Sequence, residues 1–92
     1  MALLDLLGRR WALRVLWELR DEPVGTFREL KGRCGDISSS VLAQRLRELT
    51  AAGIVARTND GYALTADGSG LLRSLAPIDR WATQWAEHHG ER

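Results

Sequence analysis

The chain of 92 residues is poor in several residue types, and each shortage excludes a class of protein. Cys34 is its only cysteine, so we expect no disulfide within one chain, no cysteine-based metal cluster, and a buried, inert thiol. Long hydrophobic runs are also missing. The opening MALLDLLGRR is short, Asp5 interrupts it, and its positive charges follow the apolar residues. We therefore expect neither a signal peptide nor a membrane span, and we predict a cytoplasmic protein.

The patterns of catalytic and metal-binding sites are missing as well. We find no nucleophile beside a base, no paired carboxylates and no glycine-rich phosphate loop, so we do not expect an enzyme. His88 and His89 are adjacent, which points their rings in different directions on a helix, and no third ligand stands nearby. We therefore expect no metal and no cofactor.

The positive charge is small in total but unevenly distributed. Residues 1–47 contain nine Lys or Arg and six Asp or Glu (+3), whereas residues 48–92 contain four and six (−2), which together give the net charge of +1. The basic excess therefore lies in the first half of the chain. The hydrophobic fraction of 45% is typical of a globular protein, and a chain of this length forms only a modest core.

Two helical segments are predicted at the start of the chain. Apolar residues recur at helical spacing over residues 11–19, and we expect Trp11 and Trp17 to lie in the core. The apolar segment ALLDLL precedes this helix, and Gly8 predicts a bend between the two. Residues 24 and 25 follow as a very short strand.

The next feature of the sequence is a pair of helices, each with an N-terminal cap, separated by a tight turn. Thr26 and Glu29 match the capping box at the start of one helix, in which Phe27 and Leu30 face the core. Ser38 is the natural N-cap of the next helix, predicted over residues 38–52, and Gly53 would end it.

The helix over residues 38–52 has two unlike faces. Leu42, Leu46 and Leu49 form an apolar stripe at positions i, i+4 and i+7. The opposite face lacks the Glu and Lys typical of a solvated helix. It carries Ser40, Ala43, Gln44 and Arg47. Small side chains allow close approach, and Gln and Arg have donors and acceptors that suit base edges and phosphates. An ordinary surface helix of modest composition is the alternative.

The rest of the chain predicts a hairpin and a long helix. Alternating β-prone residues over 54–65 surround the turn residues Asn59, Asp60 and Gly61, and Thr65 can cap the helix that follows. Over residues 66–89 an apolar stripe recurs at helical spacing, and Pro77 predicts a kink or a break near residue 76. The stripe consists of Leu71, Leu75, Ile78, Ala82 and Trp85.

This order of elements predicts a winged helix-turn-helix, a mainly α-helical fold with a small β-hairpin, in one domain over residues 1–92. In that fold the helix over residues 38–52 is the recognition helix and enters the major groove of DNA, and the hairpin over residues 54–65 is the wing. The outward face with Gln44 and Arg47 would then contact the bases.

Three segments resemble the HxlR-type transcriptional regulators, relatives of the MarR group, over nearly all of residues 3–89. They are LLGRRWALRVLWEL, TFRELKGRCGDISSSVLAQRLRELTAAGIVART and YALTADGSGLL. The second is the most specific, because it combines F-x-E-L before the turn, I-S at the start of the recognition helix, and LRELTAAGIVART. The resemblance implies a homodimer that binds double-stranded DNA at promoters and is held together by its terminal helices.

The chain departs from the family pattern at two points. Its wing has only TNDGY where the family commonly has several more residues, so the resemblance does not extend to a wing tip in the minor groove. Family members that sense oxidants or electrophiles usually carry a cysteine upstream of the segment matching LLGRRW, and none stands there. Redox sensing by that route is therefore not expected.

The predicted DNA contacts are of two kinds, bases from the recognition helix and phosphates from basic residues around it. Arg10 stands at a helix start, where a positive charge opposes the helix dipole. Either a contact with a DNA phosphate or packing of its side chain on the Trp11 indole would explain an arginine at this position. Arg45 lies nearer the apolar side, where it can pair with Glu48 or Glu29. The full set is Ser39, Ser40, Ala43, Gln44, Arg47, Arg10, Arg28, Lys31, Arg45 and Arg57.

The predicted dimer interface joins the two ends of the chain. Trp81 and Trp85 are neighbours at i and i+4, and two such large rings are hard to bury in so small a domain. The segment ALLDLL likewise lacks an obvious partner within the winged domain. The predicted interface residues are Leu3, Leu4, Leu7, Leu75, Ile78, Trp81, Ala82 and Trp85. A winged-helix protein-interaction module without specific DNA binding is the alternative function, and salt-sensitive DNA binding would separate the two.

Overall fold

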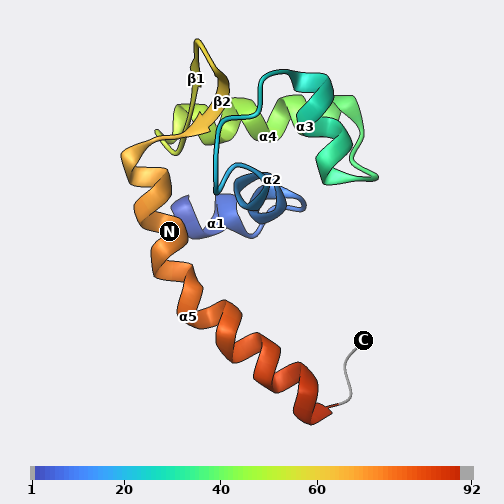
Figure 1. The fold of residues 1–92 in the computed structure, drawn as a ribbon, viewed down its shortest axis with the longest axis vertical. Helices are drawn as coiled ribbons and strands as arrows, with labels where there is room; N and C mark the ends of the chain where they lie inside the picture. Colours follow the sequence, from blue (N-terminus) through green and yellow to red (C-terminus); the bar gives the residue numbers. More distant parts are fainter. Residues whose placement is uncertain (1, 90–92) are drawn as a thin grey trace.

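The computed structural model of the chain describes residues 2–89; Met1 and residues 90–92, which the expected domain of 1–92 includes, lie outside the described residues. Five helices and one hairpin follow each other in the predicted order (Figure 1). They are α1 (Ala2–Leu7), α2 (Ala12–Glu18), α3 (Phe27–Cys34), α4 (Ser39–Ala51), β1 (Val55–Thr58), β2 (Gly61–Leu64) and α5 (Ala66–His89). Within residues 2–89, no helix is both long and apolar enough to cross a membrane.

The core lies between α2, α3, α4 and the base of the hairpin, which gather at one end of the molecule (Figure 1). Val15 and Leu16 of α2 pack there with the predicted α4 stripe of Leu42, Leu46 and Leu49. Trp11 is half-buried against this core. The prediction that Trp17 is a core residue is wrong, because its side chain lies on the outer side of α2 and is 46% exposed.

The two helices of the helix-turn-helix begin at the predicted caps. The Thr26 hydroxyl accepts the backbone N–H of Glu29 at 3.0 Å, and the Ser38 hydroxyl accepts that of Val41 at 3.2 Å. The reciprocal half of the capping box is not formed within the described residues, because the Glu29 carboxylate pairs with Arg33 one turn later. Both starts are fixed by local chemistry, so they could be located from the sequence.

The end of α4 is a Schellman turn centred on the predicted stop residue. Gly53 has a φ of 76°, a conformation that glycine adopts without strain. Its N–H donates to the Thr50 carbonyl, and the N–H of Ile54 donates to the Leu49 carbonyl, each at 3.0 Å. The buried side chains of Ile54 and Leu49 belong to the same core cluster. This turn directs the chain from α4 into the hairpin.

The hairpin is closed by the two residues Asn59 and Asp60, and it pairs Thr58 with Gly61. The predicted short strand is present as a single bridge, in which Val24 and Tyr62 exchange two backbone hydrogen bonds of 2.9 Å. Gly61 has a φ of 115°, and a Cβ at this position would overlap the carbonyl oxygen of Val24. Glycine is therefore required where the wing crosses the chain that precedes α3.

Helix α5 starts against the junction of α4 and the wing and then leaves the body of the molecule (Figure 1). The Thr65 hydroxyl accepts the N–H of Gly68 at 3.0 Å, as predicted for its cap. A Cβ on Gly68 would overlap the carbonyl oxygen of Ile54, so the helix approaches this backbone closely. Residues 66–89 form one continuous helix, so a break at Pro77 is ruled out, and Figure 1 shows the helix axis bending in its middle.

Helix α1 folds back beside α2 after the bend at Gly8 that was predicted. Leu6 and Leu7 pack against the core, so the expectation that ALLDLL has no partner within the winged domain is wrong for these residues. The segment between α1 and α2 ends at Trp11, whose backbone lies in the left-handed region with a φ of 77°. This backbone conformation costs energy for a residue with a Cβ, and the surrounding contacts must maintain it.

Candidate nucleic-acid interface

The outward face of α4 carries the side chains that the sequence predicted for it. Ser39, Ser40, Gln44 and Arg47 are exposed and Ala43 is half-buried, whereas the leucine stripe on the other side is buried. The helix therefore presents a face of small side chains with one amide and one guanidinium. Such a face can approach the floor of the major groove closely.

Four polar side chains along α4 form a connected series, which we call the α4 side-chain network: Arg47, Gln44, Glu48 and Arg45. Arg47 donates from Nη2 to Oε1 of Gln44 at 2.6 Å. Gln44 donates from Nε2 to Oε2 of Glu48 at 3.0 Å. Arg45 donates from Nη1 to Oε1 of Glu48 at 2.8 Å. Both oxygens of the Glu48 carboxylate therefore accept hydrogen bonds.

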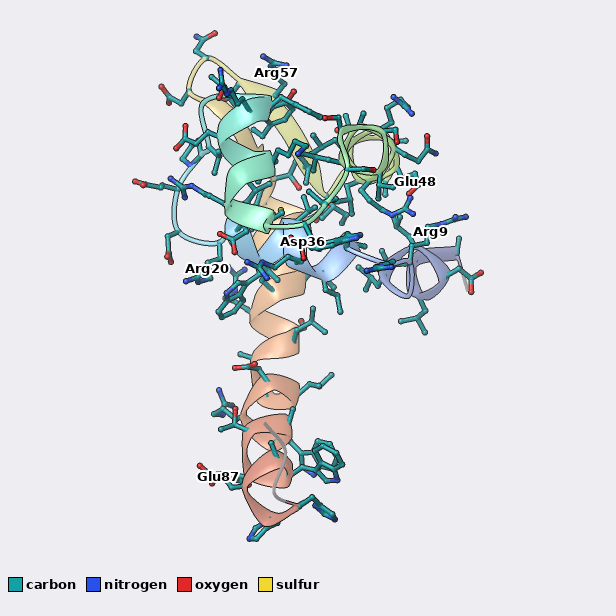
Figure 2. All side chains as sticks on the ribbon, turned by 90° about the vertical axis from the view of Figure 1, so that its right-hand side faces the viewer. Arg9, Arg20, Asp36, Glu48, Arg57 and Glu87 are labelled. Carbon is teal, nitrogen blue, oxygen red and sulfur yellow. The ribbon has the colours of Figure 1, made fainter. Side chains whose placement is uncertain are left out.

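Within the network, Glu48 lies beside the turn that joins α1 to α2. Figure 2 shows Glu48 on the side of α4 that faces Arg9, whose Nε is 3.8 Å from Glu48 Oε2. The hydrogen bond from Gln44, followed by the hydrogen bond and positive charge of Arg45, holds the pKa of Glu48 below its ordinary value. Glu48 is therefore ionised at neutral pH and balances the cations beside it.

Two of the predicted phosphate-binding residues are occupied in contacts within the chain. The side chain of Arg45 is only 14% exposed, and it also donates from Nε to the Arg10 carbonyl at 2.8 Å. We therefore do not retain Arg45 as a DNA contact. The guanidinium of Arg10 lies 5.7 Å from the centre of the Trp11 ring, which fits the packing alternative. Arg10 is exposed, so its charge is accessible to a phosphate as well.

Helix α3 contributes two cations beside α4. A DNA contact was predicted for both, and Arg28 is exposed, whereas Lys31 is half-buried because it lies nearer the core side of the short helix. Within residues 2–89 neither side chain takes part in an ion pair. Both charges are therefore uncompensated by a direct partner in the described part of the chain.

The wing holds its single arginine against an aromatic ring. Arg57 on β1 and Tyr62 on β2 are paired in the hairpin register. The guanidinium lies 4.6 Å from the centre of the Tyr62 ring, and Nη1 donates to the tyrosine hydroxyl at 2.7 Å. A groove between α4 and the wing brings Arg57 and Tyr62 together with Arg47 and Thr50.

Sequence reasoning missed part of this arrangement. The Gln44–Glu48 contact has an i, i+4 spacing that could have indicated it. The Arg57–Tyr62 pair follows from the hairpin register once the loop of two residues is known. The approach of Arg9 to Glu48 had no signal in the sequence, because it depends on how the turn before α2 folds back.

The predicted dimer residues divide into exposed and half-buried groups. Leu3 and Leu4 of α1 are exposed, whereas Leu7 and Leu75 are half-buried. On the distal part of α5, Ile78 and Trp81 are 60% and 63% exposed, Trp85 is 41% exposed, and Ala82 is also exposed. An apolar groove runs between α2 and α5. It is lined by Leu13, Trp17, Leu72, Leu75, Ala76, Ile78 and Ala82, among others.

Taken together, the capped helix pair, the glycine-terminated α4 and the short hairpin define a winged helix-turn-helix. Comparison with protein families agrees, since the model described as HxlR-like helix-turn-helix matches residues 6–90. The chain belongs to this family and is a helix-turn-helix transcriptional regulator. The resemblance that the sequence motifs indicated is thereby confirmed.

Individual relatives show the same similarity over most of the chain. The HTH-type regulator YvaP of Bacillus subtilis is 31% identical over 90 residues, which cover 90% of this chain and 82% of YvaP. The crystal structure of quinone-bound YodB from B. subtilis superposes with a TM-score of 0.82 at 35% identity, covering 90% of this chain and 93% of that one. A possible HxlR family transcriptional factor from Thermoplasma volcanium has a TM-score of 0.79 at 26% identity, with coverage of 91% and 81%.

Proposed function

We propose that the protein acts as a homodimer that binds a roughly palindromic operator. The α4 helices of the two copies would enter successive major grooves, about 34–36 Å apart. The observation that carries this proposal is the outward face of α4, where Gln44 and Arg47 stand among small side chains and the apolar stripe is buried behind them. With chromosomal DNA as its partner, the protein would act in the cytoplasm.

Base contacts in this proposal come from two side chains of α4. Arginine suits the O6 and N7 acceptors of guanine, and glutamine suits the N6 and N7 of adenine. Gln44 and Arg47 are one helical turn apart and both exposed, so they would meet neighbouring base pairs. The small residues Ser39, Ser40 and Ala43 would let the helix backbone approach the bases.

Phosphate contacts come from basic residues on the elements around α4. In a helix-turn-helix the first helix crosses the sugar–phosphate backbone, which assigns this role to Arg28 and Lys31 of α3. Arg57, held on the Tyr62 ring beside the groove between α4 and the wing, would meet the backbone from the wing. Arg10 would add a contact from the turn before α2. These interactions carry no base preference and depend strongly on salt.

Dimerisation in this proposal uses the apolar residues that the chain leaves exposed at its two ends. The distal part of α5 extends away from the core, and every residue from Ala76 to Trp85 is exposed. Large apolar surfaces of this kind mark interaction sites. A second copy related by a two-fold axis would cover them and would place the two recognition helices on one side of the dimer.

The experiment that tests the proposal selects DNA with the purified parent protein and then measures affinity for the selected duplex and for a random duplex. Gln44→Ala and Arg47→Ala should each weaken specific binding by about 1–3 kcal/mol and relax the base preference at one position. Arg73→Ala, which removes an exposed arginine from α5, is the matched control and should retain discrimination.

Unchanged discrimination in both α4 variants would contradict the assignment of base contacts. A parent that binds selected and random duplexes equally, without salt dependence, would favour the protein-interaction module instead.

A further inference from the structure

Glu48 is an acidic residue at the edge of a surface that we propose to meet a polyanion. Its side chain is 19% exposed, and its carboxylate accepts one hydrogen bond from Gln44 and one from Arg45. A bare carboxylate at this place would repel DNA. Arg45 and Arg9 lie beside the carboxylate and compensate its negative charge. The carboxylate can therefore stay at this surface and act there as a hydrogen-bond acceptor.

We propose that Glu48 is a positioning residue, which orders the Gln44 amide and, through it, the Arg47 guanidinium on the outward face of α4 before DNA is bound. This inference rests on the proposed function, because it concerns the residues to which base contact is assigned. Glu48 itself would touch no base.

The chemistry of the α4 side-chain network permits one orientation of the central amide. A carboxylate only accepts hydrogen bonds, and a guanidinium only donates them. The amide between them must therefore turn its NH₂ group to Glu48 and its oxygen to Arg47, as the distances of 3.0 and 2.6 Å describe. Removal of the carboxylate would leave the amide held only by its hydrogen bond to the exposed Arg47 side chain, and the pair would lose its attachment to the rest of the network.

Ordering of these side chains before binding affects affinity through entropy. Long polar side chains lose rotamer freedom when they are immobilised at an interface, and part of that loss is avoided when the free protein already holds them. Gln44 and Arg47 are both of this kind. Arg45 donates both to Glu48 and to the Arg10 carbonyl in the segment before α2. One end of the network is therefore held by the backbone.

The competing explanation is that Glu48 only fastens α4 to the α1–α2 turn. A fastening role would change fold stability and would weaken specific and random DNA binding together, whether or not Gln44 is present. A positioning role predicts a loss of discrimination that depends on Gln44. A double-mutant cycle between Glu48 and Gln44 separates the two.

The binding experiment uses the duplex selected by the parent and a random duplex. Glu48→Ala should weaken specific binding by about 10-fold, equivalent to about 1.4 kcal/mol, and leave random binding unchanged or tighter because a negative charge is lost. In a Gln44→Ala background the same change should have little further effect on specific binding. Glu48→Gln keeps the side-chain volume and should give an intermediate loss, whereas Glu22→Gln controls for the change in net charge.

A second measurement detects the ordering without DNA. The Nε2 group of Gln44 should show ¹⁵N relaxation close to that of the backbone in the parent, and faster motion in Glu48→Gln. The side-chain amide of Asn59 in the hairpin turn is the internal reference, since it is exposed and makes no hydrogen bond within residues 2–89.

Three results would overturn the proposal. One is a Gln44 amide as mobile as that of Asn59 in the parent. Another is a full 10-fold loss from Glu48→Ala in the Gln44→Ala background. The third is a Glu48→Ala variant that discriminates between the selected and the random duplex as well as the parent does. That result would contradict the positioning role of Glu48 but not the proposed function. A parent that does not discriminate between the two duplexes would contradict both the proposed function and the positioning role.

Discussion

Replacement of Trp85 by alanine tests the proposed dimer directly. In the isolated chain this side chain stands on the distal part of α5, stacked on His89 with the ring centres 4.9 Å apart, and it is 41% exposed. Its removal should therefore disturb the fold of one chain little. In the proposed dimer the exposed part of the ring would be covered by the second copy.

The magnitude follows from the exposed area. A tryptophan buries up to about 250 Å² when fully covered, so 41% exposure leaves about 100 Å² or somewhat less for a partner. At about 25 cal/mol per Å² this area is worth about 2 kcal/mol, and a symmetric interface loses it twice. The total of about 4 kcal/mol corresponds to a weakening of the dimer by several hundredfold or more.

Sedimentation velocity at micromolar concentration measures this change. The parent should sediment as a dimer and the Trp85→Ala variant largely as a monomer, with weaker DNA binding. Thr83→Ala, on the opposite face of α5, is the matched control and should remain dimeric. A parent that sediments as a monomer, yet binds a palindromic site tightly without cooperativity, would refute the reasoning.

Three further predictions concern phosphate contacts, the cysteine and the start of α5. Alanine substitution of Arg10, Arg28 or Lys31 should each reduce the slope of log K against log salt by about 0.9, and parental slopes in all three variants would show that these residues are only solvated. Burial, and then the charge of Glu18, raise the pKa of the Cys34 thiol above its ordinary value, so alkylation at neutral pH should be slow and DNA affinity should change little on thiol oxidation; a large, thiol-reversible loss of binding would contradict this. Because the pKa of the thiol is raised in the folded state, this group stabilises the fold at neutral pH, and that contribution should be lost as the pH rises above the ordinary pKa of a cysteine thiol in a urea-denaturation series. Gly68→Ala should lower the free energy of unfolding by about 3 kcal/mol, since its Cβ would overlap the Ile54 carbonyl, whereas Gly32→Ala, with open space around it, should be neutral or slightly stabilising; equal effects would show that α5 moves away without cost.

Local chemistry explains why most of the fold could be predicted from the sequence. Thr26, Ser38 and Gly53 each mark a helix end through hydrogen bonds to residues within four positions, and the α4 leucines mark its buried face by their spacing. Pro77 predicted the local structure less well, because a kink or a break was expected near residue 76. An interior proline removes one hydrogen bond, and α5 remains a continuous helix in spite of that loss.

The parts that could not be predicted depend on contacts between distant segments. Leu7 packs inward because α1 folds back beside α2 after Gly8, a contact that the sequence did not indicate. Trp17 was an error of another kind, because it lies on the side of α2 opposite the buried Val15 and Leu19, as helical spacing indicates. In the candidate interface, the exposure of Gln44 and Arg47 followed from helical spacing. The anchoring of Arg45 on the Arg10 carbonyl is a contact across 35 positions with no signal in the sequence.

The close approach of Gly68 to Ile54 has a mechanical consequence for the proposed dimer. From Gly68 to His89 the helix is about 30 Å long, at about 1.5 Å per residue. A tilt of about 10° at the Gly68 junction would displace the far end by about 5 Å, which is as large as the rise of one helical turn. With the far ends joined between two copies, the same tilt would change the distance between the two α4 helices by a similar amount. In the proposed dimer, the absence of a side chain at position 68 would thus set the angle between α5 and the helix-turn-helix, and with it the operator spacing that the dimer would accept.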